Sequence, residues 1–471
     1  RLVSFFGRIN YNYNETYMLS LIMRRDGSSN FARGQRWGNF PSISAGWVIT
    51  QENFMEKTRN WLDFLKIRAS WGQNGNCNIT PYQYLASIAF DGHAGYSFGN
   101  IRNSYYQGAY PDILPNPNVT WETSEQTNIG IDARFLNQRL GVTVDYYIKK
   151  TKDWLVQAPI MDTYGTNAPY INGGDVENKG FEVSLDWHDT IGSDFNYSAG
   201  LNFSYNKNEI TRIDNAEQII WGSTNVLSEG TSAVYRCMVG EPIGYFYGYK
   251  TVGVFQNQAD IDAWKAQYGE NCFLQINPQP GDLKFVDTDG NKKIDERDKT
   301  NIGKPMPDWR MGINLSANYK GFDLSISGTG AFGQQIARSY RAFTSGSTDN
   351  YTTEYLNFWH GEGTSNRYPK MAGTKASVNW QNISDIYIED ADYFRLKNVT
   401  LGYNFKRLLP NMPLSKARLY VSAQNLFTIT GYKGLDPEVG TGSKSEGWAS
   451  GVDLGVYPTP RTYLVGLSIE F

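Results

Sequence analysis

Apolar and polar side chains alternate along most of this chain, in segments of about 9 to 12 residues. The last segment shows the pattern clearly, because strand side chains point alternately to opposite faces. Its other face includes Gly466 and Ser468, and its apolar face consists of Tyr463, Val465, Leu467, Ile469 and Phe471. Equivalent segments are centred on Ile9, Leu21, Ala45, Ile67, Ile131, Val144, Val183, Leu201, Leu315, Leu324, Leu401 and Val421. The chain is therefore predicted to be all-β, with about thirteen strands.

The connections between these segments alternate between short and long. Tight turns are predicted at residues 14–15, 137–139, 189–194 and 320–321, and long connections at residues 74–124, 150–178, 206–307 and 333–392. Aromatic residues also lie near the ends of the apolar faces, for example Tyr11, Trp71, Trp187 and Phe427. Outer-membrane barrels combine short periplasmic turns, long extracellular loops and aromatic girdles, whereas soluble sandwiches rarely do. The pattern predicts a transmembrane antiparallel β-barrel with long extracellular loops.

The two ends of the chain fit the same interpretation. The terminal strand, with its apolar face and final Phe471, resembles the closing strand that the assembly machinery of bacterial outer-membrane barrels reads. We expect Val465, Leu467 and Ile469 to face lipid. The first residues are already strand-like and show no signal peptide, and an odd number of strands cannot close a bacterial single-chain barrel. We therefore expect further strands upstream of Arg1, one of which pairs with the last strand.

Composition narrows the class of protein. Of the 471 residues, 15% are aromatic, 19% are charged and 47 are glycine, which excludes disorder and favours a turn-rich β-protein. No apolar run approaches the roughly 18 residues of a membrane helix, so the chain can span a bilayer only as a barrel. The formal net charge of −3 argues against nucleic acid as the main partner. The three cysteines match no zinc spacing and are interpreted as incidental.

The stretch DTDGNKKIDERD, residues 287–298, has the spacing of a cation-binding loop. Oxygen atoms at alternate positions converge on a hard cation such as Ca²⁺ or Mg²⁺. The candidate ligands are Asp287, Asp289, Asn291, the backbone carbonyl of Lys293, Asp295 and Asp298. Two positions depart from the usual loop, because Lys292 replaces the turn glycine and Asp298 replaces the longer glutamate. The alternative is an acidic surface turn.

Catalytic chemistry has little support in the sequence. His93, His188 and His360 are isolated from one another, and no nucleophile elbow, phosphate loop or HExxH motif occurs. The carboxylates at residues 385–392 could form a glycosidase pair, but a solvated loop explains them better. The chain is predicted not to be an enzyme.

The long loops are rich in aromatic side chains. Tyrosine and tryptophan suit sugar rings, peptide side chains and protein partners. The candidate substrate- or partner-binding residues are Tyr105, Tyr106, Tyr110, Trp221, Trp380 and Trp448. The alternative for each is that the loops pack on one another.

Several stretches, taken in order, resemble the SusC/RagA family of TonB-dependent outer-membrane transporters of the Bacteroidetes. They include RRDGSSNFARGQRWGNFPSISAGW from Arg24, LKIRASWGQNGN from Leu65, YINGGDVENKGFEVSLDW from Tyr170, PGDLKFVDTDGNKKIDERD from Pro280 and VYPTPRTYLVGLSIEF from Val456. The resemblance spans nearly the whole chain. It implies a barrel of about 22 strands, of which this chain supplies about the last thirteen. It also implies a plug domain and a TonB-binding segment that this chain does not contain.

The resemblance further implies a function. Such a protein imports oligosaccharides or oligopeptides across the bacterial outer membrane, with TonB supplying the energy and a SusD-like surface lipoprotein as partner. The family's Asp-rich loop coincides with residues 287–298. Two alternatives stay open: an outer-membrane receptor or adhesin that does not transport, and a secreted β-rich glycan hydrolase.

Overall fold

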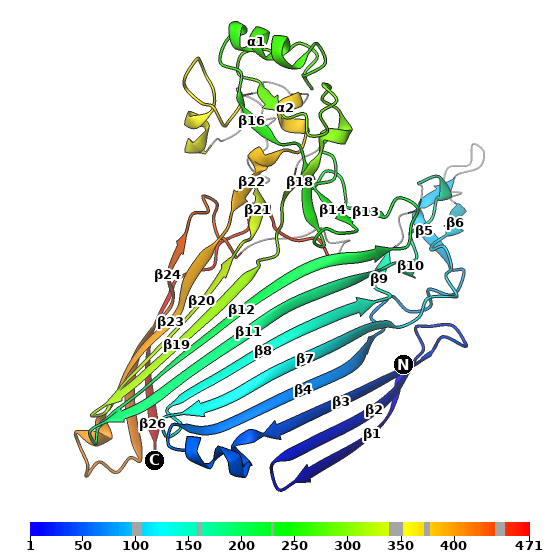
Figure 1. The fold of residues 1–471 in the computed structure, drawn as a ribbon. Coiled ribbons are helices and arrows are strands. Elements are labelled where there is room, and N and C mark those ends of the chain that lie inside the picture. The colour runs from blue at the N-terminus through cyan, green and yellow to red at the C-terminus, as the bar shows by residue number, and fades with distance from the viewer. Residues whose placement is uncertain are drawn as a thin grey trace. The chain divides into compact units, whose positions relative to one another are not determined.

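The computed structural model describes residues 1–96, 106–157, 160, 162–227, 230–338, 352–371, 377–438 and 448–471. In these ranges, thirteen strands form one antiparallel sheet whose order follows the order of the chain (Figure 1). The strands are β1 (Leu2–Tyr13), β2 (Tyr17–Ser28), β3 (Trp37–Val48), β4 (Leu62–Asn76), β7 (Glu122–Phe135), β8 (Leu140–Lys152), β11 (Gly174–Ile191), β12 (Phe195–Ile213), β19 (Trp309–Tyr319), β20 (Phe322–Phe332), β23 (Tyr393–Asn404), β24 (Lys416–Thr430) and β26 (Thr462–Glu470). Each strand coincides with one of the predicted segments, so the predicted strands are confirmed.

The short connections have the backbone conformations that tight turns need. Strands β19 and β20 pair Tyr319 with Phe322, which leaves Lys320 and Gly321 as a two-residue hairpin loop. Both loop residues have positive φ, 47° and 92°, as a type I′ turn requires. At the β1–β2 turn, Asn14 and Glu15 also have positive φ. The predicted tight turns at these two places are confirmed.

The chain divides into two compact units, which are described separately. The first comprises Arg1–Trp187, Asn206–Ile220 and Met238–Glu241. Besides its strands of the large sheet, it contains η1 (Ile49–Gln51), η2 (Asn53–Thr58), β5 (Ile88–Tyr96), β6 (Tyr106–Pro111), β9 (Leu155–Gln157), η3 (Asp162–Tyr164) and β10 (Tyr170–Asn172). A small buried cluster that includes Phe31, Phe40 and Trp121 packs loop residues against the ends of the strands.

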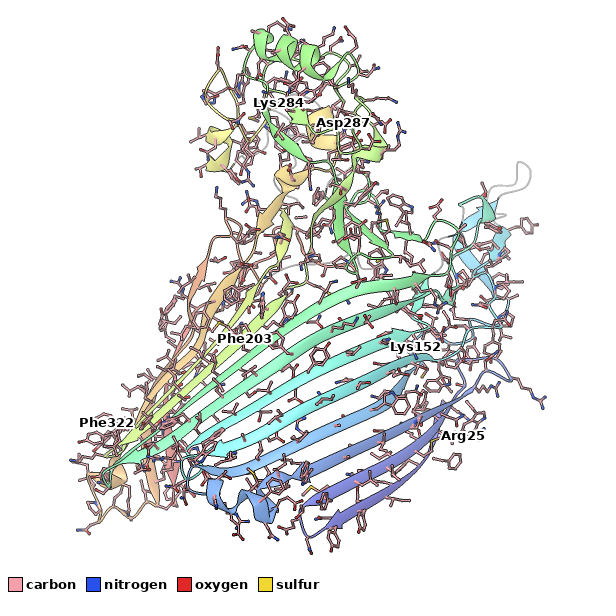
Figure 2. All side chains as sticks on the ribbon, viewed as in Figure 1. Arg25, Lys152, Phe203, Lys284, Asp287 and Phe322 are labelled. Atoms are coloured by element: carbon pink, nitrogen blue, oxygen red, sulfur yellow. The ribbon has the colours of Figure 1, made fainter. Side chains whose placement is uncertain are left out.

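The second unit comprises His188–Tyr205, Trp221–Cys237 and Pro242–Phe471. Its strands β19, β20, β23, β24 and β26 lie side by side, and α1, α2 and β16 lie together beyond one end of them (Figure 1). We call this group of connecting segments the loop-built part. Lys284 and Asp287 lie in it, and Phe322 lies at the other end of the unit (Figure 2). The segment predicted as one loop over residues 206–307 begins later than expected, because β12 extends to Ile213.

Short elements, several of them paired in small sheets, make up the loop-built part and its connections. They are β13 (Ile219–Trp221), β14 (Tyr235–Met238), β15 (Tyr245–Gly248), β16 (Thr251–Val254), α1 (Gln258–Tyr268), β17 (Leu283–Phe285), η4 (Glu296–Asp298), β18 (Thr300–Gly303), β21 (Gln335–Arg338), η6 (Thr353–Asn357), α2 (Val378–Gln381), η7 (Asp385–Tyr387), β22 (Ile388–Asp390) and β25 (Val452–Asp453). At the other end of the unit, η8 (Phe405–Arg407) connects β23 to β24. Among the described helices, none is long and apolar enough to cross a membrane.

Apolar side chains are distributed differently in the sheet and in the loop-built part. On the sheet, large apolar residues such as Ile9 and Leu467 are exposed. In the loop-built part, residues such as Phe246, Leu283 and Trp380 form one buried core. A continuous exposed apolar face is unfavourable in water, whereas lipid chains solvate it well. The sheet therefore has the surface expected of a membrane-spanning wall.

Candidate functional site

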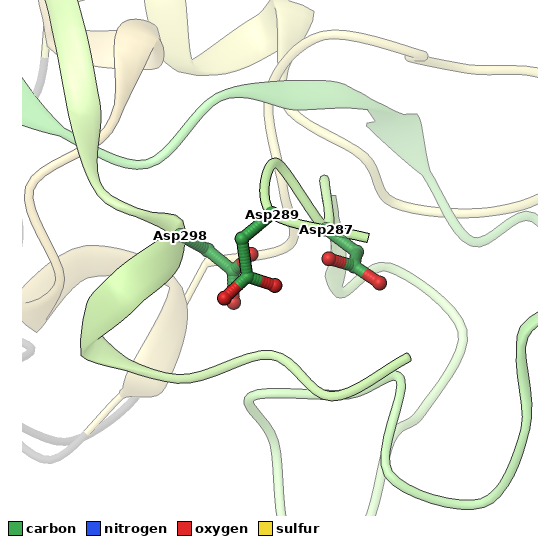
Figure 3. A group of neighbouring side chains, drawn as sticks. All are labelled: Asp287, Asp289 and Asp298. Carbon is green, nitrogen blue, oxygen red and sulfur yellow. The ribbon is translucent and has the colours of Figure 1, made fainter. Parts of the chain in front are cut away.

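The acidic loop, residues 287–298, lies between β17 and β18 and ends with η4, in the loop-built part of the second unit. It brings together Asp287, Asp289 and Asp298, and one carboxylate oxygen from each lies within 4.8 Å of the other two (Figure 3). Two ligands of one calcium ion, each at about 2.4 Å, are at most about 4.8 Å apart. The spacing of the three carboxylates therefore fits a hard cation.

Backbone hydrogen bonds hold these carboxylates in place. Asp298 is fully buried, and its two oxygens accept hydrogen bonds from the backbone N–H groups of Thr288 and Asp295, both at 2.8 Å. Asp287 accepts from the N–H groups of Gly290 at 2.7 Å and Lys292 at 2.6 Å. The loop is thus folded around its own acidic side chains.

Lys292 occupies the position where such loops usually have glycine. Its φ is 63°, in the left-handed region that glycine adopts without steric cost. The chain therefore makes the turn with a lysine in that position. The sequence pattern left the turn geometry open, and the structure shows that the turn forms.

The other predicted ligands are not all directed at the cluster. Asp295 receives Arg297 Nη2 at 3.0 Å and Lys293 Nζ at 3.2 Å, so its carboxylate is already paired. The Asn291 side chain donates to Asp289 at 2.8 Å, and its own oxygen accepts from the Lys293 N–H at 2.8 Å. Of the six predicted ligands, the structure gathers three carboxylates and directs Asp295 elsewhere.

Local charges and hydrogen bonds keep this loop anionic. The Arg297 guanidinium beside Asp295 holds the pKa of that carboxyl well below its usual range. Slight burial raises the pKa of Asp287, but the donating N–H groups of Lys292 and Gly290 outweigh it and leave the pKa below its usual value. Both groups are therefore ionised at neutral pH, as cation binding requires.

The predicted aromatic contact residues divide into two groups. Tyr106 and Tyr110 on β6 are exposed, and Trp221 is 45% exposed. Trp380 is only 1% exposed and stacks on Phe358 with ring centroids 5.3 Å apart. Trp380 therefore belongs to the core, where loop aromatics pack on one another, and it is not placed to touch a ligand.

The two remaining aromatic predictions have different outcomes. Trp448 is partly buried and packs against Tyr235, with ring centroids 6.4 Å apart. Tyr105 lies outside the described residues. For Trp448, as for Trp380, packing within the loop-built part accounts for the aromatic side chain.

The residues predicted as an assembly signal all lie on or just after β26, the last strand of the sheet. Tyr463, Val465, Leu467, Ile469 and Phe471 are exposed, as the alternation predicts. Their strand pairs with β24, where Leu467 faces Leu419. Recognition by an assembly machinery stays a prediction.

The polar face of the sheet carries ion pairs in the first unit. Arg68 on β4 reaches Asp132 at 3.0 Å and Asp145 at 2.6 Å, on the next two strands. Lys152, labelled in Figure 2, pairs with Glu125 at 3.0 Å. In these cross-strand pairs, the cationic and acidic groups neutralise each other, so they are less available to a solute.

The polar face of the second unit carries neutral hydrogen-bonding groups as well as an ion pair between Arg418 and Asp323. The hydroxyl oxygens of Ser198 and Ser316 are 2.7 Å apart, and those of Thr400 and Ser422 are 2.8 Å apart. Asn398 joins the second pair, because its oxygen accepts from Ser422 and its amide donates to Thr400. Hydroxyl and amide groups both donate and accept, so this face can exchange its hydrogen bonds for those of a polar solute.

A buried ionic network near one end of β23 was missed by the sequence reasoning. Arg395 contacts Asp436 and Glu438, each at 2.5 Å. Lys397 also reaches Glu438, at 2.6 Å, and the Tyr393 hydroxyl donates to it at 2.8 Å. Two sequence features could have indicated the network. Tyr393, Arg395 and Lys397 are spaced two residues apart, and Asp436 and Glu438 form a D-x-E motif.

A β-bulge explains why strict alternation hides this network. The pairing of β20 with β23 joins Ser327 to Asn398 but Gly328 to Leu396, which leaves Lys397 as an extra residue. A bulge shifts the alternation by one position and re-aims the side chains beyond it. Counting by twos along β23 therefore places Arg395 on the wrong face.

Comparisons with known proteins agree with this architecture. The family described as TonB dependent receptor-like, beta-barrel, matches residues 1–426. Over its whole length the chain is 34% identical to TonB-dependent receptor P3 of Formosa agariphila and 33% identical to TonB-dependent receptor SusC of Bacteroides thetaiotaomicron. It covers 45% and 44% of these two proteins, so it spans a little under half of their length.

The fold is also similar to a solved structure. The whole chain superimposes on 48% of a chain in the structure of the RagAB peptide transporter, with a TM-score of 0.79 and 25% sequence identity. The resemblance to SusC and RagA is thus confirmed, and with it the barrel fold and the location in the outer membrane. The chain belongs to the β-barrel family of TonB-dependent receptor-like proteins.

Proposed function

We propose that this chain forms part of the wall of an outer-membrane importer for oligosaccharides or oligopeptides. One observation carries the proposal: the sheet has an exposed apolar face and an opposite, polar face that includes hydroxyl and amide groups in the second unit. A wall of this kind separates lipid from an aqueous path.

The chemistry of the polar face suits such cargo. Sugars and peptides carry many hydrogen-bond donors and acceptors, and groups such as Ser316 and Thr400 can serve as either. Passage requires binding that is weak enough to be released. Neutral hydrogen bonds contribute only about 0.5–1.5 kcal/mol each, so they satisfy this requirement better than ion pairs.

The proposal includes two protein partners. TonB supplies the energy, and a SusD-like surface lipoprotein covers the extracellular side. Support comes from family membership and from the RagAB structure, which is described as a peptide transporter. The exposed Tyr106, Tyr110 and Trp221 offer aromatic surface for the lipoprotein or for cargo.

Uptake by intact cells tests the proposal. Cells that express the full-length protein as their only route for a labelled oligomer should accumulate it, and deletion of the TonB system should abolish accumulation. Uptake that persists without TonB would refute energised import. Surface binding without accumulation would identify the receptor or adhesin alternative, and release of cleaved sugars would identify the hydrolase.

We also propose that the acidic loop binds Ca²⁺ or Mg²⁺. Asp287, Asp289 and Asp298 would hold the ion, which would supply charge neutralisation and cross-link the loop. The spacing of the three carboxylates and the lowered pKa of Asp287 support this assignment.

Calcium titration of the full-length protein tests the metal site. Chelation should increase backbone hydrogen exchange in residues 287–298 while the sheet stays folded. Asp287→Ala should weaken calcium binding, and Asp262→Ala, a carboxylate on the exposed side of α1, is the matched control. Unchanged calcium affinity in Asp287→Ala would refute the assignment of this loop as a metal site.

A further inference from the structure

A cavity of about 630 Å³ opens in the second unit, among described residues. Residues of strands β19, β20 and β23 line it, together with the segments at residues 305–307, 437–438 and 450–451. Its apolar lining includes Met306 and Pro437, and its charged lining consists of Arg310, Lys397 and Glu438. The cavity therefore combines an apolar wall with a small number of charged groups, as binding sites for small ligands do.

The two carboxylates beside this cavity, those of Glu438 and Asp436, already accept several hydrogen bonds. Glu438 receives the Tyr393 hydroxyl on one oxygen, and Arg395 and Lys397 on the other. Asp436 accepts from Arg395 on one oxygen and from a backbone N–H on each. These two carboxylates therefore have little capacity left to attract a cationic or hydroxyl-rich ligand.

Arg310 provides an unused donor group in the same cavity. It is exposed, and within the described parts of the chain its guanidinium has no ion pair or hydrogen bond. Its neighbours across the sheet are Ser204 and Ala331, neither of which carries a charge. The cavity lining has two cations and one carboxylate, and Lys397 is already paired with Glu438. The surplus is one positive charge, located on Arg310.

We propose that this cavity binds a carboxylate of the transported molecule, with Arg310 as the contacting residue. The planar guanidinium presents two parallel N–H donors that match the two oxygens of a carboxylate. Met306 and Pro437 cover an adjoining apolar part of the same molecule. The inference rests on the proposed import function and narrows its substrate class to acidic oligomers, either uronic-acid sugars or peptides with a free carboxylate.

Binding measurements on the full-length protein test this assignment apart from transport. The sugar probes are a galacturonic-acid hexamer and a neutral glucose hexamer. The peptide probes are one pentapeptide with a free and with an amidated C-terminus. Wild-type protein should bind the acidic member of one pair in preference to its neutral partner, and the pair that shows the preference identifies the source of the carboxylate.

Substitutions at Arg310 locate the binding site. Arg310→Gln should weaken binding of the preferred acidic probe by about 10- to 100-fold and leave the neutral probe unchanged, because a charge-assisted hydrogen bond is lost. Arg310→Lys keeps the positive charge but lacks the two parallel N–H donors of a guanidinium. Its affinity for the acidic probe should therefore lie between those of wild-type protein and Arg310→Gln. Lys416→Gln is the matched control, because Lys416 is an exposed cation that lines a different cavity of the same unit.

Each outcome decides between the alternatives. Equal losses of affinity for the acidic probe in Arg310→Gln and Lys416→Gln would indicate general electrostatic attraction and overturn the proposal. Equal binding of acidic and neutral probes by wild-type protein would also overturn it. So would a failure of wild-type protein to bind either acidic probe. Charge-dependent binding at Arg310 combined with TonB-independent uptake would support the site while rejecting the proposed import function. The temperature at which each variant loses its compact gel mobility verifies that it is folded.

Discussion

The sheet and the loop-built part use the same apolar residues in opposite ways. Leu467 on β26 is 63% exposed, whereas Leu283 on β17 is fully buried. Both are leucines on strands, so neither side-chain chemistry nor secondary structure explains the difference. The surroundings do, because lipid solvates an apolar face and water does not. Whether apolar side chains are exposed or buried thus depends on whether lipid or water surrounds the region.

Their polar residues differ in the same way. The sheet directs its hydroxyl and amide groups to one face, where they remain partly accessible, as at Ser198 and Thr400. The loop-built part uses acidic groups such as the buried Asp298 to fold its own backbone. The sheet therefore offers its polar groups to solutes, and the loop-built part uses them for its own structure.

The largest expected effect comes from opening the buried core. Trp380→Ala removes a ring that is almost wholly enclosed and should cost about 3–5 kcal/mol, because it leaves a cavity. Limited proteolysis of the full-length protein should then cut within the loop-built part while the sheet remains protected. Trp221→Ala, at an exposed tryptophan, is the control, and similar cleavage rates for the two variants would contradict the assignment of Trp380 to a core.

A charge on the apolar face of the sheet should have the next largest effect. Leu467→Arg should cost about 2–4 kcal/mol if the residue lies near the bilayer midplane, because the guanidinium must enter lipid. The measurement is the fraction that folds into lipid vesicles, followed by gel mobility without heating. Ser468→Arg changes the adjoining residue on the other face and should fold normally. If both variants folded equally well, the assignment of the two faces would be wrong.

Removal of the buried carboxylate of the acidic loop should have a smaller, local effect. Asp298→Ala leaves the N–H groups of Thr288 and Asp295 without their acceptor, at a cost of about 1–3 kcal/mol. Hydrogen exchange in residues 287–298 should rise. The control is Glu296→Ala, because Glu296 is an exposed carboxylate of the same loop that is not among the proposed ligands. Equal exchange in the two variants would show that burial of Asp298 does not stabilise the loop.

The smallest effect is expected from pH. The pKa of Asp287 is below its usual value in the folded loop, so its contribution to stability is present above the unfolded pKa of about 3.9 and is lost as pH falls through the folded value. Hydrogen exchange in residues 287–298, corrected for intrinsic rates, should be constant from about pH 7 to pH 5 and should rise below about pH 4. In Asp287→Asn, the rise in hydrogen exchange at low pH should be smaller, because this side chain does not titrate. A transition near neutral pH would contradict the direction of the pKa shift.

Much of the wall could be predicted because its rule is local. A strand between lipid and water alternates apolar and polar side chains residue by residue. Strands such as those around Leu201 and Leu315 can therefore be recognised from the sequence alone. The spacing of residues 287–298 likewise located the acidic loop, because turn-forming oxygens recur at fixed short intervals. No such local rule distinguishes Trp380 in a core from Trp221 on a surface.

The sequence by itself determined the strands, their faces, the tight turns and the family, since each depends on residues that are close along the chain. Only the tertiary structure decided which carboxylates of the acidic loop converge, which loop aromatics are buried, and how the bulge at Lys397 brings Arg395 to Glu438. These features depend on which distant segments meet, and a one-residue bulge reverses the face of every side chain beyond it. The exposed Arg310 likewise shares a cavity with Met306 and Pro437 only in the folded chain.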